Sequence, residues 1–200
     1  YWQLNDCWQV TSWSSIDYYH NWKALHYQVK RSFEPKMLSM AEENNSYKIY
    51  FCNDDFQKYT GNLELELLSL NGKSLLKKVK NVEINENSNV VVYEIPKEEF
   101  ERFDFKNSLL KAKFGNIDAH WFFCKPKEIK LTQPQITIAK IDSKTIEISS
   151  NVLAKDVYLE TKNNRFNDNF FDLLPNEKKI ISAEKPIDDL KIKSLFDVRY

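Results

Sequence analysis

Short runs in which apolar and polar residues alternate recur through most of the chain, and they limit the fold more than any other feature. The run LELEL at 63–67 has a strict period of two, which places Leu on one face of a strand and Glu on the other. Asn71–Gly72 follows between two such runs, and this dipeptide is a strong β-hairpin signal. Short strands with regular turn signals are typical of antiparallel β-sandwiches. The predicted strands of a first sandwich are 38–41, 47–52, 62–70, 74–84, 89–95, 108–114 and 119–124.

The alternation restarts after the stretch 125–134, which holds three Lys and two Pro and is interpreted as a linker or a bridging edge strand. Before it, residues 96–103 are predicted to form one helical turn with Pro96 at its first position. The later runs predict a second, smaller sandwich. Its strands are expected at 135–141, 144–150, 156–161, 169–174, 178–184, 190–195 and 196–200.

The first 36 residues differ in composition from the rest of the chain, because they hold nine of its 28 aromatic residues. Residues 1–4 (YWQL) are predicted to be a buried strand, followed by a polar and aromatic loop. An amphipathic helix comes next, with Asn21 as its cap and Pro35 as its stop. One strand and one helix cannot bury their own faces, so this unit must belong to a larger layer. The predicted apolar face of the helix is Trp22, Leu25, His26, Val29 and Phe33.

Composition excludes several functions. The three glycines are all more than ten residues apart, so no Gly-rich phosphate loop can form. The formal net charge of zero argues against nucleic-acid binding, and no apolar run is long enough to span a membrane. The chain begins without a signal peptide or an initiator Met, which predicts a piece of a longer protein. We expect no cofactor, no nucleic-acid partner and no membrane contact.

Neither the cysteines nor the acidic loops indicate a metal. Cys7, Cys52 and Cys124 are odd in number and widely spaced, which fits neither a zinc site nor a disulfide framework. Cys52 and Cys124 each end an apolar strand-like run, so small buried side chains are expected there, with a single Cys52–Cys124 bridge as the alternative. The Asx-rich segment 163–172 admits calcium, but it lacks the EF-hand order, and a turn held by Asx side chains is favoured. His26 lies on the apolar helix face, so packing is favoured over ligation.

Two stretches together resemble β-mannosidases of glycoside hydrolase family 2. Residues 1–33 (YWQLNDCWQVTSWSSIDYYHNWKALHYQVKRSF) look like the last strand and helix of that family's (β/α)8 catalytic barrel. Residues 158–180, with the run Asp-Asn-x-Phe-Asp-Leu-Leu-Pro at 168–175, resemble its C-terminal immunoglobulin-like domain. The resemblance implies a mainly β chain with three parts: a barrel remnant (1–36), a first immunoglobulin-like sandwich (37–127) and a second one (128–200).

The resemblance also implies a site. The family's catalytic nucleophile and acid/base are two Glu residues on earlier barrel strands, so no residue here is assigned a catalytic role and the chain alone is expected to be inactive. The last strand's end faces the active site in barrel enzymes. Trp2 is therefore expected to form one wall of the subsite for terminal β-D-mannose, with Asn5, Asp6 and Trp8 as supporting loop residues. The implied partners are a β-mannoside oligosaccharide and the rest of the parent chain, and a periplasmic or secreted parent is compatible with the sequence.

Two other hypotheses stay open. One is a non-catalytic module that binds carbohydrate or protein through an exposed aromatic platform. The other is a structural role in bracing the barrel. Residues 1–36, cut from their neighbours, are expected to dock on the first sandwich, to self-associate or to be disordered. If ordered, the helix face named above should contact protein. The platform candidates are Tyr47, Tyr50, Tyr93, Trp121 and Tyr158.

Overall fold

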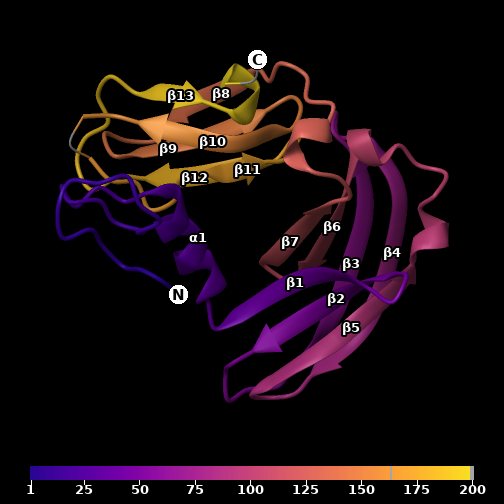
Figure 1. Cartoon of the computed structure of the whole chain (residues 1–200). Coiled ribbons are helices and arrows are strands. Elements are labelled where there is room, and N and C mark those ends of the chain that lie inside the picture. Colours follow the sequence, from indigo (N-terminus) through magenta and orange to yellow (C-terminus); the bar gives the residue numbers. More distant parts are fainter. Residues whose placement is uncertain (163, 199–200) are drawn as a thin grey trace. The chain divides into compact units, whose positions relative to one another are not determined.

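The computed structural model describes residues 1–162 and 164–198, and these are mainly antiparallel β-structure (Figure 1). The chain divides into two compact units, of which one holds residues 34–131 and the other holds residues 1–33 together with 132–200. The finer division at residues 36 and 127 stays a prediction. Among the described residues, no helix combines the length and the apolar character that crossing a membrane requires.

The unit of residues 34–131 is a sandwich of a 3-stranded sheet, in the order β1-β2-β5, and a 4-stranded sheet, in the order β4-β3-β6-β7. The strand positions confirm the prediction for this half of the chain. The connections contain the 3-10 turns η1 (Lys97–Glu99), η2 (Phe105–Asn107) and η3 (Pro126–Glu128). The strands are β1 (Lys36–Glu43), β2 (Ser46–Asn53), β3 (Tyr59–Ser69), β4 (Ser74–Ile84), β5 (Ser88–Pro96), β6 (Ser108–Phe114) and β7 (Ile117–Phe122).

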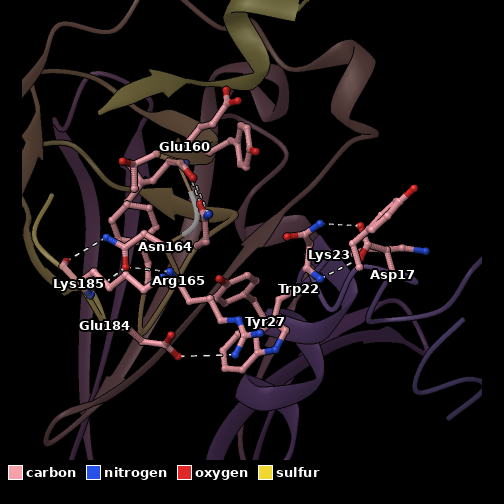
Figure 2. Close-up of a pocket in the computed structure, with 16 residues that line it drawn as sticks. Asp17, Trp22, Lys23, Tyr27, Glu160, Asn164, Arg165, Glu184 and Lys185 are labelled. Atoms are coloured by element: carbon pink, nitrogen blue, oxygen red, sulfur yellow. Dashed lines mark hydrogen bonds and ion pairs between the residues drawn. The ribbon is translucent and has the colours of Figure 1, made fainter. Parts of the chain in front are cut away.

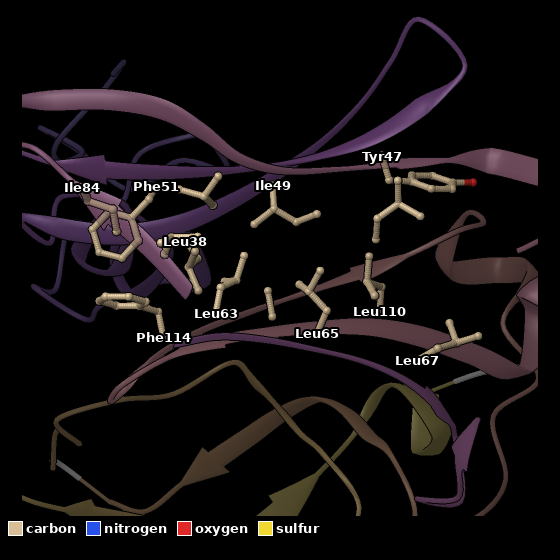
Figure 3. Packing of buried hydrophobic residues seen from close by; sticks show 14 of the residues in the cluster. Leu38, Tyr47, Ile49, Phe51, Leu63, Leu65, Leu67, Ile84, Leu110 and Phe114 are labelled. Atoms are coloured by element: carbon tan, nitrogen blue, oxygen red, sulfur yellow. The ribbon is translucent and has the colours of Figure 1, made fainter. Parts of the chain in front are cut away.

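The core of this sandwich follows from the alternation of its strands. Leu63, Leu65 and Leu67 of β3 are buried, as the LELEL pattern predicts. Figure 3 shows Leu63 and Leu65 pointing toward the opposite sheet, which carries Ile49 and Phe51. Burial of each such side chain stabilises the fold by roughly 1.5–3 kcal/mol. The β3–β4 hairpin turns at Asn71–Gly72, where Gly72 has a φ of 84° that a glycine adopts without strain.

The second sandwich pairs the 3-stranded sheets β11-β10-β13 and β12-β9-β8. Its core contains Ile146 and Ile148 of β9 against Val157 and Leu159 of β10. The predicted strand at 196–200 is wrong over its described part, since residues 195–198 form the 3-10 turn η4 (Leu195–Val198), and residues 199–200 lie outside the described residues. The strands are β8 (Ile136–Lys140), β9 (Thr145–Ser150), β10 (Ala154–Glu160), β11 (Phe171–Leu173), β12 (Lys178–Ser182) and β13 (Lys191–Lys193).

The alternative of a Cys52–Cys124 bridge is wrong, because Cys7, Cys52 and Cys124 are all free thiols. The Cys52 Sγ atom lies 3.4 Å from Oδ1 of Asn89 on the neighbouring strand. Burial raises the pKa of the Cys52 and Cys124 thiols, whose side chains are half-buried, so the thiol form is favoured at neutral pH.

The N-terminal segment differs from its prediction in two ways. Residues 1–4 do not form a regular strand, because a strand needs a paired neighbour. Within the described chain the segment pairs only through short contacts, such as the backbone N–H of Ile16 donating to the Leu4 carbonyl at 2.9 Å. The helix α1 (Ala24–Ser32) begins later than predicted, and Asn21 does not cap it. The Asn21 side chain instead donates to Oδ2 of Asp17 at 2.9 Å.

Candidate functional site

The four residues predicted to line a sugar subsite separate into two groups. Trp2 is 74% exposed and Trp8 is 69% exposed, and Asn5 is exposed as well. Asp6 is only 5% exposed. The aromatic faces are therefore open to a partner or ligand, whereas the carboxylate lies inside the loop.

Asp6 is held by the loop that follows it. Ser12 donates its hydroxyl to Oδ1 at 2.5 Å, and Lys23 donates to Oδ2 at 3.0 Å. The Ser12 hydrogen bond, with help from Ser14 and Lys23, holds the pKa of Asp6 below its usual value despite the opposing effect of burial. Lys23 also donates to the Ser14 hydroxyl at 2.7 Å. Asp6 thus ties the start of the loop to its end.

Ser15 is a second residue that links distant parts of the same segment by hydrogen bonds, and it is fully buried. Its hydroxyl donates to the Leu4 carbonyl at 2.9 Å, while the Tyr1 hydroxyl lies 3.1 Å and His26 Nδ1 3.2 Å from the same oxygen. Because the Ser15 proton is used on Leu4, we infer that Tyr1 and His26 Nδ1–H both donate to Ser15. The packed role predicted for His26 is confirmed, since its ring also lies 4.4 Å from that of Trp22.

The C-terminal end of α1 is clasped by the Asx-rich loop of the second sandwich. Arg31 Nη1 lies 2.5 Å from Oδ1 of Asp168 and donates to the Asn169 carbonyl at 3.2 Å. Arg31 Nη2 donates to the Phe170 carbonyl at 3.2 Å. One guanidinium therefore interacts with acceptors on three consecutive residues, 168–170. The planar guanidinium carries several N–H donors in a fixed geometry, which suits this arrangement. We call this set of contacts the Arg31 clasp.

Two further cations, Lys30 and Lys179, extend the clasp. Lys30 donates to the Asn167 carbonyl at 2.7 Å, and Lys179 lies 2.9 Å from Oδ2 of Asp168. Lys30 and Arg31 are also the basic residues of the last helical turn, where the helix dipole favours positive charge.

The loop keeps its shape through Asn169, which is buried. The Asn169 Oδ1 atom accepts the backbone N–H groups of Leu159 and Phe170 at 2.8 and 2.9 Å, and Nδ2 donates to the Leu159 carbonyl at 2.8 Å. Phe170 has a φ of 52°, a conformation that is uncommon for an aromatic residue. The predicted Asx-held turn is confirmed over 164–172, with Phe166 and Phe171 buried, and residue 163 lies outside the described residues.

The buried face of α1 is not the predicted one. Tyr27 is 3% exposed and lies against Phe170, with ring centroids 6.0 Å apart, whereas Phe33 is 71% exposed and Leu25 is exposed too. Trp22 and Val29 are half-buried. The segment thus docks on the second sandwich rather than the first. Of its predicted stripe, Leu25 and Phe33 are exposed, and the other three residues are at most half-buried.

Arg165 holds the other end of this docked segment. Its guanidinium lies 5.3 Å from the Trp22 ring, and Nη2 donates to the His20 carbonyl at 3.2 Å. Sequence reasoning missed Tyr27, Arg31 and Arg165. The basic last turn of the helix and the aspartate of the 168–175 run were visible signals, but nothing local in the sequence joins residues so far apart.

A polar cavity of ≈ 680 Å³ lies beside these contacts, within the unit formed by residues 1–33 and 132–200. Figure 2 shows Trp22 and Tyr27 on one side of it, with Asn164, Arg165 and Glu160 from the sandwich. Among the described residues, no group of three or more His, Cys, Asp or Glu side chains is arranged to hold a metal ion.

Comparison with known proteins gives the same picture for both sandwiches. A family model described as a mannosidase Ig/CBM-like domain matches residues 45–128, and a model of the mannosidase Ig-fold domain matches residues 131–198. The structure is similar to a β-D-mannosidase from Dictyoglomus thermophilum, with a TM-score of 0.83 and 27% identity over 97% of this chain and 26% of that chain. The chain is homologous to the C-terminal region of β-mannosidases of glycoside hydrolase family 2.

The sequence relatives extend this finding. The β-mannosidase of Mus musculus is 26% identical over 99% of this chain, and β-mannosidase A of Aspergillus terreus is 24% identical over 98%. An exo-chitosanase from Amycolatopsis orientalis has the same fold, with a TM-score of 0.72 at 14% identity over 97% of this chain and 29% of that chain. The chain spans 25% of the length of these two β-mannosidase relatives. A substrate contact by Trp2, Asn5, Asp6 or Trp8 stays a prediction.

Proposed function

We propose that this chain is the C-terminal accessory region of a β-mannosidase that removes terminal β-D-mannose from oligosaccharides with retention of configuration. The observation that supports the proposal most is the similarity to a β-D-mannosidase across 97% of the chain, which includes the N-terminal segment as well as both sandwiches. The two Ig-like sandwiches alone would fit several glycosidases. The aromatic segment before them is what favours a mannosidase.

In this proposal, residues 1–33 are the last strand and helix of a (β/α)8 barrel. Trp2, Trp8, Trp13 and Phe33 all expose more than half of their surface. Large apolar groups gathered in one segment are typical of a surface that another part of a protein covers. The remaining barrel strands and helices of the parent are the proposed cover.

The chain itself supplies no catalytic residue. Retaining glycosidases use two carboxyl groups about 5–5.5 Å apart, one as nucleophile and one as acid and base. The resemblance places both on earlier barrel strands. The role proposed for Trp2 is to stack against the apolar face of the mannose ring, with Trp8 and Asn5 beside it. Asp6 holds the loop in place rather than the sugar, because its oxygens already have partners within the loop.

The second sandwich has a bracing role in this proposal. The Arg31 clasp and the buried Tyr27 fix the helix that follows the last barrel strand. Any displacement of this helix moves the loop that carries Trp8. The sandwich thereby preserves the geometry of one wall of the active site without contacting the sugar.

The test is a panel of aryl glycosides given to the full-length protein that contains this chain. The proposal predicts hydrolysis of the β-mannoside with retained configuration, and much slower hydrolysis of the β-galactoside, β-glucuronide and β-glucosaminide. The 200-residue chain alone should be inert. Turnover of the β-mannoside by the chain alone, or preference of the full-length protein for another glycoside, would contradict the proposal.

A further inference from the structure

The polar cavity beside the docked helix has the size of a ligand site. Its volume of ≈ 680 Å³ falls within the range of about 300–1,000 Å³ that is typical of small-molecule sites. We propose that it binds a short neutral saccharide, at a position separate from the predicted mannose subsite at Trp2. This inference does not depend on the parent's proposed activity, since a sandwich can hold sugar whether or not a barrel cleaves it.

The charges around the cavity cancel, which favours a neutral ligand. The lining contains three acidic and three basic residues, so the formal sum is zero. Several of these charges have internal partners: Lys23 with Asp6 at 3.0 Å and Arg165 with Glu184 at 3.7 Å. A strongly charged ligand would have to compete with these pairs. The six charged lining residues are Asp17, Glu160, Glu184, Lys23, Arg165 and Lys185.

The cavity wall is already fixed before any ligand arrives. Asn164 Nδ2 donates to the Lys185 carbonyl at 2.9 Å, and its Oδ1 accepts the N–H groups of Arg165 and Lys185, each at 3.0 Å. Thr161 donates its hydroxyl to the Asp188 carbonyl. Binding to a wall with fixed rotamers loses less conformational entropy than binding to a mobile one.

Two polar groups on the wall remain available for a ligand. Within the described chain, the Glu160 carboxylate has no hydrogen-bond or ion-pair partner, and neither has the Tyr158 hydroxyl. The Tyr158 ring is held in place by stacking on Phe170, with centroids 4.8 Å apart. An ionised carboxylate accepts short, strong hydrogen bonds from hydroxyl groups, and its two oxygens match two neighbouring hydroxyls of a sugar.

An aromatic surface is present as well. Tyr19 lines the cavity and exposes more than half of its surface. A pyranose ring presents C–H groups on one face and hydroxyls around its edge, so an open aromatic ring together with a free carboxylate and a free hydroxyl matches both parts. Tyr158 is one of the aromatic residues that the binding-module hypothesis selects from the sequence, and the structure places it at this cavity.

The experiment is a titration of the ¹⁵N-labelled 200-residue chain with β-1,4-mannobiose, followed by NMR. Backbone and indole resonances of cavity residues, with Trp22 and Thr161 as reporters, should shift in a saturable manner with a Kd of about millimolar. Glu160→Gln removes the charge while keeping the size, and Tyr158→Phe removes the hydroxyl while keeping the stacked ring. Each should weaken binding at least about fivefold, because a hydrogen bond to the sugar is lost.

Tyr59→Phe and Glu94→Gln are the matched controls, since they make the same changes at a Tyr and a Glu of the other unit. They should leave the Kd unchanged. The spectrum of each variant reports directly on whether it is folded. Cavity resonances that do not shift at saturating mannobiose, or a Kd that neither cavity variant raises, would overturn the proposal. Either result leaves the aryl-glycoside test of the parent unaffected.

Discussion

At the scale of single residues, the 168–175 run is explained by its contacts. The Asp168 carboxylate pairs with Arg31, and the Phe170 carbonyl accepts a hydrogen bond from the same guanidinium. The Asn169 side chain joins the loop to β10 by accepting the backbone N–H of Leu159. The sequence predicts the Asx-held turn, because Asx side chains bond to nearby backbone groups. It does not predict Arg31 as partner, because that contact joins positions 137 residues apart and has no local signature.

Asn169→Ala should destabilise the chain strongly. The change leaves the backbone N–H and carbonyl of Leu159 without their side-chain partner in a buried place, so the free energy of unfolding should fall by about 2–4 kcal/mol. Asn151→Ala is the matched control, because Asn151 is exposed and accepts one hydrogen bond, from Gln135. Its effect should be under about 1 kcal/mol. Urea unfolding measures both, and equal effects would contradict this role of Asn169.

Arg31→Ala should weaken the docking of α1. Three acceptors lose their donor, but the Arg31 side chain is one-third exposed, so the loss should be about 1–2 kcal/mol. Arg31→Lys should restore only part of it, because an ammonium group cannot reproduce the fork geometry. Lys58→Ala is the control, since its pair with Glu83 is well exposed. Unchanged urea stability of Arg31→Ala would show that the clasp does not hold the helix.

The protonation of His26 should make stability depend on pH. Burial, followed by the charges of Arg165 and Lys30, lowers the pKa of His26 below its ordinary value near 6.5. His26 therefore binds a proton more readily in the unfolded chain than in the folded one. The stability that neutral His26 contributes is complete above pH 6.5 and is lost as the pH falls through the folded pKa. His26→Gln should flatten the stability profile between pH 7.5 and pH 5.5, relative to the unchanged chain. Profiles that stay parallel would contradict this assignment.

At the scale of elements, the sandwich strands between residues 36 and 193 were predictable, whereas the strands expected at 1–4 and 196–200 and the buried helix face were not. The alternation of apolar and polar residues in a strand predicts which side chains point inward. In β3 this prediction agrees with the burial of Leu63, Leu65 and Leu67. The helical periodicity predicts an apolar stripe, but it does not predict which part of the protein packs against that stripe. In α1 the second sandwich takes Tyr27, which is off the predicted stripe, while Phe33 remains exposed.

Leu65→Ala tests the core of the first sandwich. Removal of a buried Leu leaves a cavity between the two sheets, so the free energy of unfolding should fall by about 2–5 kcal/mol. Glu66→Ala, on the next position of the same strand, removes only a side chain paired with Lys77 on the outer face. It should change stability by less than about 1 kcal/mol. A comparable loss in both variants, by urea unfolding, would contradict the assigned faces of β3.

At the scale of the whole molecule, the two sandwiches follow from the sequence and the place of residues 1–33 does not. Each sandwich closes its own core, so local alternation suffices to predict it. The N-terminal segment has one face docked through Tyr27 and another that leaves Trp2, Trp8 and Phe33 exposed. A segment with two faces needs two partners, and the proposed barrel is the second.

The most direct test of this account is the hydrolysis of an aryl β-mannoside by the full-length protein carrying Trp2→Ala. Loss of a stacking aromatic wall should lower kcat/KM at least about tenfold, which corresponds to about 1.4 kcal/mol. Phe56→Ala removes an even more exposed aromatic outside the segment and should leave kcat/KM unchanged. If the Trp2 and Phe56 variants hydrolyse the mannoside as fast as the unchanged protein, then residues 1–33 do not form a wall of a mannosidase active site.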